Sequence, residues 1–286
     1  MRRSLGREGE APEEEDEDLE DPGGPEDDVE MGFFDHLGEL RMRLVRALLG
    51  VVPGMAIGWL YKEELLDILT APLITAWHQL GLGEPQLHFA NPIDPFVGYL
   101  KLAAVAGLLI SSPWVFYQLW AFISPGLYRR EKALAIPFVL ASTLFFAGGA
   151  VFGYLVVFPM AFETLLDFAG LLPSESLRIE PTIMFTEYLG FATRMLLAFG
   201  VTFEVPVIVT FLSLAGVVNW RQLLRFARWW LLISGFVAAL LTPPDVGSQM
   251  MMLVPLNVLY WVSIGLAWAF GPKVPKGGVT EDGFER

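Results

Sequence analysis

Residues 188–214 read Tyr188-Leu-Gly-Phe-Ala-Thr-Arg-Met-Leu-Leu-Ala-Phe-Gly-Val-Thr-Phe-Glu-Val-Pro-Val-Ile-Val-Thr-Phe-Leu-Ser-Leu214, and only Arg194 and Glu204 carry charge in this stretch. A helix needs about 20 mainly apolar residues to cross a bilayer. This stretch is long enough, and five others qualify. The sequence therefore predicts an all-α polytopic membrane protein with six transmembrane helices. The spans are expected at about residues 44–61, 96–120, 133–158, 188–214, 226–241 and 250–270.

The charge is concentrated in the first 30 residues. The chain has 286 residues, is 54% hydrophobic and 18% charged, and carries a net charge of −13. Residues 1–30 hold 14 acidic residues and three arginines, so we expect a disordered acidic cytoplasmic tail there. The remaining chain is nearly neutral, which argues against a nucleic-acid-binding body. The absence of cysteine excludes a disulfide scaffold and a cysteine-ligated metal site.

Lys and Arg placement predicts the orientation of the spans. Outside the acidic tail, twelve basic residues fall on the side that both termini share and four on the other, so we expect the N and C termini, including residues 271–286, in the cytoplasm. Two outer connections, about 62–95 and 159–187, are long enough to carry structure of their own. Residues 63–80 have helical apolar spacing and are expected to pack on the outer ends of the spans.

The sequence contains no motif of a known catalytic site. It has three histidines, no His-Glu-x-x-His pair, no Gly-x-Ser-x-Gly and no Walker loop. We therefore expect a protein that is not an enzyme and that holds no metal or cofactor.

Residues 31–43 are expected to form an amphipathic interfacial helix before the first span. Phe33, Leu37 and Leu40 share one helical stripe, and Glu39 and Arg43 share another. Two interpretations of Glu39 remain open. It either forms an i,i+4 pair with Arg43, or it serves as an exposed anionic receptor.

The inner loop after the second span carries a second carboxylate. Glu131 lies among Arg129, Arg130 and Lys132, whose mutual repulsion it reduces. Together with Glu39 it also supplies two carboxylates on one membrane face, each able to accept a bidentate arginine. An adjacent apolar cluster offers a further contact and comprises Phe122, Leu127 and Tyr128.

Glu204 is a carboxylate near the middle of an apolar span. Such a group costs at least about 2.5–3.5 kcal/mol in hydrocarbon. Pro206 removes one backbone hydrogen bond, so we expect a kink and a free Thr202 carbonyl. These polar groups are expected to face a concave, partly hydrated groove and to contact a partner helix.

The last outer connection is a tight turn before the sixth span. Asp245 is expected to cap that span, and a functional carboxylate is an equally good interpretation. The turn residues singled out are Pro243, Pro244, Asp245, Ser248 and Gln249. The preceding span is short, because 16 residues rise only about 24 Å. This length is consistent with local bilayer thinning or with simple burial against longer helices.

Four motifs in order resemble the twin-arginine translocase C subunit family, TatC. They are Phe34-Asp-His-Leu-Gly-Glu-Leu-Arg-Met-Arg-Leu44, Gln118-Leu-Trp-Ala-Phe-Ile-Ser-Pro-Gly-Leu-Tyr-Arg-Arg-Glu131, Ala198-Phe-Gly-Val-Thr-Phe-Glu-Val-Pro206 and Leu241-Thr-Pro-Pro-Asp-Val-Gly-Ser-Gln249. The similarity spans about residues 31–270 and leaves out the acidic tail.

The resemblance implies a six-span receptor in the cytoplasmic (inner) membrane. Such proteins bind the twin-arginine signal peptides of folded cargo, work with the single-span subunits TatA and TatB in a larger complex, and use the proton-motive force. The family's paired signal-binding glutamates match Glu39 and Glu131. Its intramembrane glutamate matches Glu204, and its outer-turn aspartate matches Asp245. Gly38 departs from the family, which usually has a bulkier residue there.

Two other classes compete with this interpretation. A proton-coupled small-solute transporter would use Glu204 as a relay, but no internal repeat is visible in the sequence. A non-transporting membrane scaffold would tolerate the loss of Glu39 and Glu131.

Overall fold

The structure is a computed structural model that describes residues 33–123, 135–171, 178–241 and 246–271. The chain divides into two units, Met1–Gly38 and Glu39–Arg286. In the first unit the described residues are the opening turns of a helix. All contacts given below lie within the second unit. The predicted acidic tail and the residues after Gly271 lie outside the described ranges.

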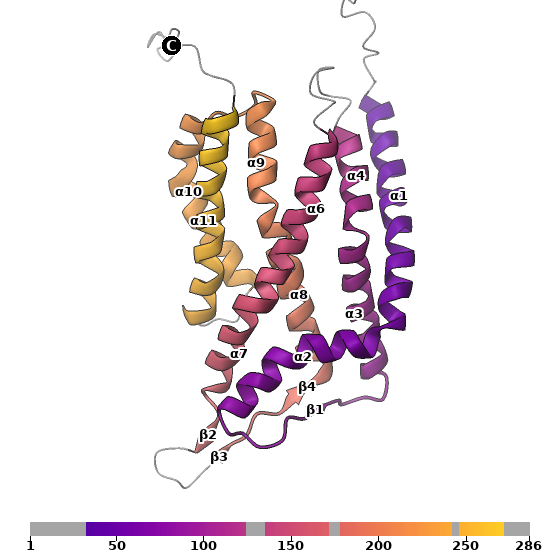
Figure 1. The fold of residues 1–286 in the computed structure, drawn as a ribbon, viewed down its shortest axis with the longest axis vertical. Helices are drawn as coiled ribbons and strands as arrows, with labels where there is room; N and C mark the ends of the chain where they lie inside the picture. The colour runs from indigo at the N-terminus through magenta and orange to yellow at the C-terminus, as the bar shows by residue number, and fades with distance from the viewer. Residues whose placement is uncertain (1–32, 124–134, 172–177, 242–245, 272–286) are drawn as a thin grey trace, which may run out of the picture. The chain divides into compact units, whose positions relative to one another are not determined.

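The described residues are almost entirely helical (Figure 1). The helices are α1 (Phe33–Leu60), α2 (Lys62–Gln79), α3 (Asp94–Ile110), α4 (Ser112–Ile123), α6 (Ala135–Phe152), the π-helical turn η3 (Gly153–Val157), α7 (Phe158–Leu166), α8 (Phe185–Phe203), α9 (Val205–Leu214), α10 (Trp220–Leu241) and α11 (Val246–Phe270). The strands are β1 (Leu87–His88), β2 (Gly170–Leu171), β3 (Arg178–Ile179) and β4 (Ile183–Met184).

Six spans account for these helices, which confirms the predicted fold class. Five segments in the described ranges are each long and apolar enough to cross a membrane: His36–Leu60, Ile136–Leu166, Phe185–Leu214, Trp220–Leu240 and Gln249–Phe270. The sixth is the pair α3 and α4, which bends by 60° at Ser111. The bend was not expected within 96–120. Pro113 has no N–H for the Leu109 carbonyl, and the Ser112 hydroxyl donates to that carbonyl at 2.8 Å instead.

Several helix ends differ from the expected ones. The residues assigned to a separate interfacial helix and to the first span form one continuous helix, α1. The third span continues past the expected end at 158 to Leu166, through a π-helical turn that precedes Pro159. Helix α10 has 22 residues rather than 16, because the arginine-rich segment from Trp220 continues it. The whole helix rises about 33 Å, but its apolar part remains the predicted 16 residues with a rise of about 24 Å, so both interpretations of this short apolar part stay predictions.

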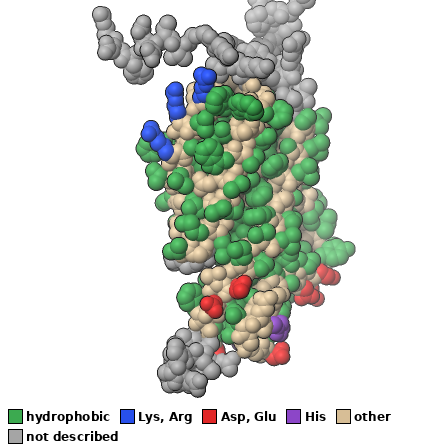
Figure 2. Space-filling view, turned by 60° about the vertical axis from the view of Figure 1, so that its left-hand side comes forward, with side chains coloured by type: hydrophobic (Ala, Val, Ile, Leu, Met, Phe, Trp, Pro, Cys, Tyr) green, Lys and Arg blue, Asp and Glu red, His purple; other side chains and the backbone are tan. Residues whose placement is uncertain are grey.

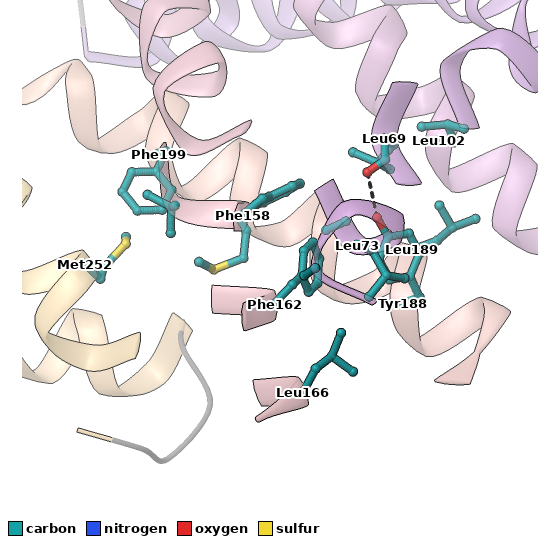
Figure 3. Packing of buried hydrophobic residues seen from close by; sticks show 14 of the residues in the cluster. Leu69, Leu73, Leu102, Phe158, Phe162, Leu166, Tyr188, Leu189, Phe199 and Met252 are labelled. Atoms are coloured by element: carbon teal, nitrogen blue, oxygen red, sulfur yellow. Dashed lines mark hydrogen bonds between the residues drawn. The ribbon is translucent and has the colours of Figure 1, made fainter. Parts of the chain in front are cut away.

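Helix α2 caps one end of the bundle, as predicted for residues 63–80 (Figure 1). We call this end, which also carries the four strands, the cap end. The Tyr188 hydroxyl of α8 donates to the Leu69 carbonyl at 2.7 Å (Figure 3). Strand β1, which follows α2, pairs in parallel with β4, which precedes α8. The two long connections therefore hold each other and cover the same end of the bundle.

The main core lies under this cap. Leu69 and Leu73 of α2 meet Phe158 and Phe162 of α7 and Leu189 of α8 in one buried cluster (Figure 3). A second cluster joins α4, α6 and α9 and consists of Phe116, Trp120, Phe138, Phe146, Val207 and Phe211. A third cluster joins α10 and α11, where the rings of Trp230 and Tyr260 stack at 4.7 Å.

Helix α1 packs closely on α3 and α4 through small residues. A Cβ built on Gly54 would lie 2.6 Å from the Gly107 carbonyl oxygen, and one built on Gly58 would lie 2.9 Å from that of Ala103. Such small residues let helix backbones approach in a membrane, where no hydrophobic force drives helices together. Trp114 adds a polar tie, since its Nε1–H donates to the Arg46 carbonyl at 2.9 Å.

Candidate functional site

Glu39 lies near the start of α1 and forms the predicted pair with Arg43. The Arg43 Nη2 is 2.6 Å from the Glu39 Oε1, and Arg43 Nε donates to the same oxygen at 2.7 Å. The second oxygen, Oε2, is buried and has no hydrogen-bond partner among the described residues. Glu39 therefore has one oxygen paired within the helix and one unpartnered, buried oxygen. Its interpretation as an exposed anionic receptor stays a prediction.

Phe122 lies at the same end of the bundle as Glu39. Helices α1 and α4 run antiparallel and are fixed to each other by the bond between Trp114 and the Arg46 carbonyl. From that bond, α1 rises about 10 Å back to Glu39, and α4 rises about 12 Å forward to Phe122. Phe122 is half-buried at the end of α4. The chain continues from here into the loop that carries Glu131.

The other members of this predicted site lie outside the described residues. They are Leu127, Tyr128 and Glu131. The structure thus places Glu39 and Phe122 at one end of the bundle and gives no distance from Glu39 to Glu131.

Glu204 stands at the break between α8 and α9. Helix α8 ends at Phe203, α9 begins at Val205, and Pro206 occupies its first turn. This break agrees with the expected kink. The Thr202 carbonyl is not free as expected, because it accepts a backbone N–H at the helix end. Thr202 and Pro206 are both buried.

The Glu204 carboxyl is buried inside the bundle. The residue is 6% exposed, and its Oε1 has no hydrogen-bond partner among the described residues. Its polar neighbour is the Ser142 hydroxyl of α6, which also accepts a hydrogen bond from Trp120 Nε1 at 3.1 Å. The carboxyl is thus covered in the single chain, and the expected hydrated groove stays a prediction. Ser142 of α6 lies beside the carboxyl, and Trp120 of α4 bonds to Ser142.

Sequence reasoning missed these two neighbours of Glu204. Trp120 is 4% exposed and Ser142 is 1% exposed, so both are core residues with a polar group. Trp120 lies within the quoted motif from Gln118 to Glu131, but its partner lies on another helix. Ser142 is a single hydroxyl in an apolar run, a pattern that many helices show without function.

The predicted outer turn is mostly outside the described residues. Pro243, Pro244 and Asp245 fall there, as does the side chain of Ser248. Helix α11 starts at Val246, directly after the residue expected to cap it. Gln249 Nε2 donates to the Gly235 carbonyl at 3.4 Å and so links α11 to α10.

Together these features define a class of protein. It is a six-span helical membrane protein with two candidate functional carboxylates among its described residues, Glu204 inside the bundle and Glu39 at the end opposite the cap. Within the described residues, no group of three His, Asp or Glu side chains could hold a metal ion.

The chain belongs to the TatC family. The family model described as Sec-independent protein translocase protein (TatC) matches residues 35–255. The TatC of Desulforapulum autotrophicum is 44% identical over 241 residues, which cover 84% of this chain and 86% of that protein. The TatC of Aquifex aeolicus is 34% identical over 236 residues, 82% of this chain and 94% of that one.

Two solved structures agree with this assignment. A crystal structure of the twin-arginine translocase receptor TatC matches with a TM-score of 0.69 and 34% identity, over 81% of this chain and 97% of that one. A second, in DDM, matches with a TM-score of 0.71 and 33% identity, over 81% and 99%. The family is a protein translocase component and not a known enzyme family.

Proposed function

We propose that this chain is the core receptor subunit of a twin-arginine protein export system. In this proposal Glu39 and Glu131 each accept one arginine of the signal peptide of a folded cargo protein. The observation that carries it is the open Oε2 of Glu39, a buried carboxylate oxygen without a partner among the described residues. A guanidinium is the natural donor for such an oxygen, since charge-assisted hydrogen bonds are the strong ones.

The apolar surface beside Glu39 supports the same role. Phe122, with Leu127 and Tyr128 in the following loop, is proposed to contact the apolar part of the signal peptide. Arg43 occupies Oε1 of Glu39, so a signal-peptide arginine is proposed to bind through Oε2. Signal-peptide binding and release then involve exchange at Oε2 alone.

The orientation of the bundle follows from its charges. Arg43 and Arg46 lie at the same end as Phe122, and the acidic residues of α2 lie at the cap end. Figure 2 shows Lys and Arg side chains near one end of its visible face and Asp and Glu side chains toward the other. By the positive-inside rule we assign the arginine-rich end, and with it both termini, to the cytoplasm. The membrane is then the cytoplasmic membrane, and the cap faces outward.

We further propose that the single-span subunits TatA and TatB associate with this chain for transport driven by the proton-motive force. The break at Glu204 is the proposed partner-helix region, together with Thr202 and Pro206. The outer turn, with Asp245, is proposed to order the connection between α10 and α11. In the single chain Glu204 is covered, so partner binding there needs a shift of α4 or α6 away from the carboxyl.

Crosslinking of a twin-arginine signal peptide tests the receptor assignment. Membranes that contain the full chain are mixed with a signal peptide bearing a photo-reactive group next to its arginine pair. Glu39→Gln and Glu131→Gln should each reduce the crosslink about tenfold or more, because each loses a charge-assisted bond. Glu163→Gln, a change of an exposed carboxylate at the cap end, is the matched control and should have no effect.

An additional variant separates the two interactions of Glu39. Arg43→Gln frees Oε1 and keeps the carboxylate, so signal-peptide crosslinking should persist or increase. If both glutamate variants bind as well as the wild type, or if Arg43→Gln abolishes binding as completely as Glu39→Gln, the assignment of Glu39 as receptor is incorrect.

A further inference from the structure

Arg194 is an arginine on the exposed surface of a membrane-spanning helix. It lies within the span Phe185–Leu214, and its side chain is exposed. Its Nε donates to the Gly190 carbonyl at 2.8 Å, and among the described residues it forms no ion pair. An exposed cation within a span is costly unless an anion or water meets it. Any anion that pairs with it therefore comes from outside the described residues.

The side chain of Arg194 points toward the cap end. The span has 30 residues, about 45 Å of helix, which exceeds the hydrocarbon core of about 30 Å. Tyr188 marks the cap end of the helix, since it is bonded to Leu69 of α2. Arg194 lies about 9 Å further along the helix. Because its Nε reaches back to Gly190, the guanidinium is directed to the border of the hydrocarbon, as snorkelling arginines are.

Four exposed residues follow one another on this face at intervals of seven, or about two helical turns. From the cap end they are Glu187, Arg194, Val201 and Ile208. The face thus changes along its length from anionic to cationic to apolar. Val201 and Ile208 are 63% and 48% exposed, and Glu187 forms no ion pair among the described residues.

We propose that this face binds one phospholipid with an ethanolamine headgroup. Its phosphate meets Arg194, its ammonium meets Glu187, and an acyl chain lies along Val201 and Ile208. The order of groups on the helix is the order of groups in the lipid from the aqueous border inward. The distance from Arg194 to Ile208, about 21 Å, is enough to accompany a chain through one leaflet of about 15 Å.

The same face disfavours other anions. A carboxylate on a neighbouring helix would satisfy Arg194, but it would leave Glu187 facing a second negative charge. A glycerol headgroup lacks the ammonium and leaves Glu187 unpaired. Free phosphate gains nothing from Val201 and Ile208. This site is independent of the proposed signal-peptide site, which lies at the opposite end of the bundle.

Native mass spectrometry of the full chain in detergent tests the proposal. The probes are palmitoyl-oleoyl phosphatidylethanolamine and the matching phosphatidylglycerol. Arg194→Ala should weaken retention of the most tightly bound phosphatidylethanolamine molecule about tenfold or more. Arg194→Lys should weaken that retention less. Glu187→Gln should keep the lipid but abolish the preference for ethanolamine over glycerol. Arg228→Ala, which removes an exposed arginine from α10, is the matched control and should change neither property.

Three outcomes would overturn the proposal. First, the wild type and Arg194→Ala could retain phosphatidylethanolamine equally well. Arg228→Ala could lose as much lipid as Arg194→Ala, which would indicate general attraction to arginine. Finally, Arg194→Ala could lose a co-expressed single-span subunit while it keeps its phosphatidylethanolamine, which would assign Arg194 to a protein carboxylate instead.

Discussion

The Tyr154 hydroxyl donates a hydrogen bond of 2.8 Å to the Ile68 carbonyl. In a regular helix this carbonyl would accept the N–H of residue 72, but Pro72 has none. The next carbonyl, that of Leu69, accepts the Tyr188 hydroxyl (Figure 3). Two tyrosines on different helices thus bind adjacent carbonyls of α2, and the irregularity caused by Pro72 fixes the position of the cap.

We expect loss of these hydroxyls to loosen α2. Tyr154→Phe and Tyr188→Phe should each lower the free energy of unfolding by about 0.5–1.5 kcal/mol, the usual contribution of one hydrogen bond. Hydrogen exchange of the α2 amides should speed up more than that of α10. Tyr117→Phe, a change of an exposed tyrosine on α4, is the control. Unchanged exchange in the Tyr154 and Tyr188 variants would show that apolar packing alone holds the cap.

The contact between α1 and α3 should be sensitive to a single methyl group. Gly54→Ala places a Cβ 2.6 Å from the Gly107 carbonyl oxygen, so the backbones must separate, at a cost of about 1–3 kcal/mol. Gly148→Ala is the control, because a Cβ there meets nothing within 4 Å. Thermal unfolding in detergent should show a lower midpoint for Gly54→Ala only. Equal midpoints would mean that α1 is not held by this close approach.

The six spans were predictable because hydropathy is a local property of the sequence. The bend at Ser111 was missed because Ser112 and Pro113 lie inside an apolar run that satisfies the length criterion. Helix α10 extends beyond its predicted apolar span for a related reason. Arg221, Arg225 and Arg228 reduce hydropathy but are good helix formers, so the helix is longer than its apolar part.

The surroundings of Glu204 were not predictable from its own span. Its polar neighbour Ser142 comes from α6, and Trp120 of α4 bonds to that hydroxyl. A carboxylate in an apolar span indicates that water or a polar group must contact it. The pattern does not identify which group that is. For Glu39 the local i,i+4 pattern was sufficient to predict its ion pair, since its partner Arg43 is on the same helix. Its open oxygen became evident only in the structure.

The hairpin of α10 and α11 should depend on a polar contact within the membrane. Asn257 Nδ2 donates to Ser234 Oγ at 3.1 Å and to the Leu253 carbonyl at 2.8 Å. Asn257→Ala should destabilise the protein by about 0.6–2 kcal/mol, as expected for polar contacts between membrane helices. Ser263→Ala is the control, because that hydroxyl bonds only within its own helix, to the Leu259 carbonyl. Similar thermal midpoints for the two variants would contradict this prediction.

Glu204 offers the sharpest distinction between partner binding and proton transfer. Glu204→Ala removes the carboxyl beside Ser142 and leaves a gap next to Trp120, so we expect weaker co-purification of the single-span subunits and reduced export. Signal-peptide crosslinking near Glu39 should be unchanged, because that site lies elsewhere in the bundle. Glu204→Gln keeps the size and hydrogen bonding of the side chain and should be milder.

Ser142→Ala completes this comparison. It removes the hydroxyl that lies between Trp120 and the carboxyl but retains an ionisable group. If partner association depends on the shape and hydrogen bonds of this cluster, Ser142→Ala should resemble Glu204→Ala in direction and be weaker. If instead Glu204→Gln abolishes export as completely as Glu204→Ala while Ser142→Ala is harmless, ionisation itself is required and a proton relay becomes the better assignment. If all three variants export normally, the buried carboxyl has no part in transport.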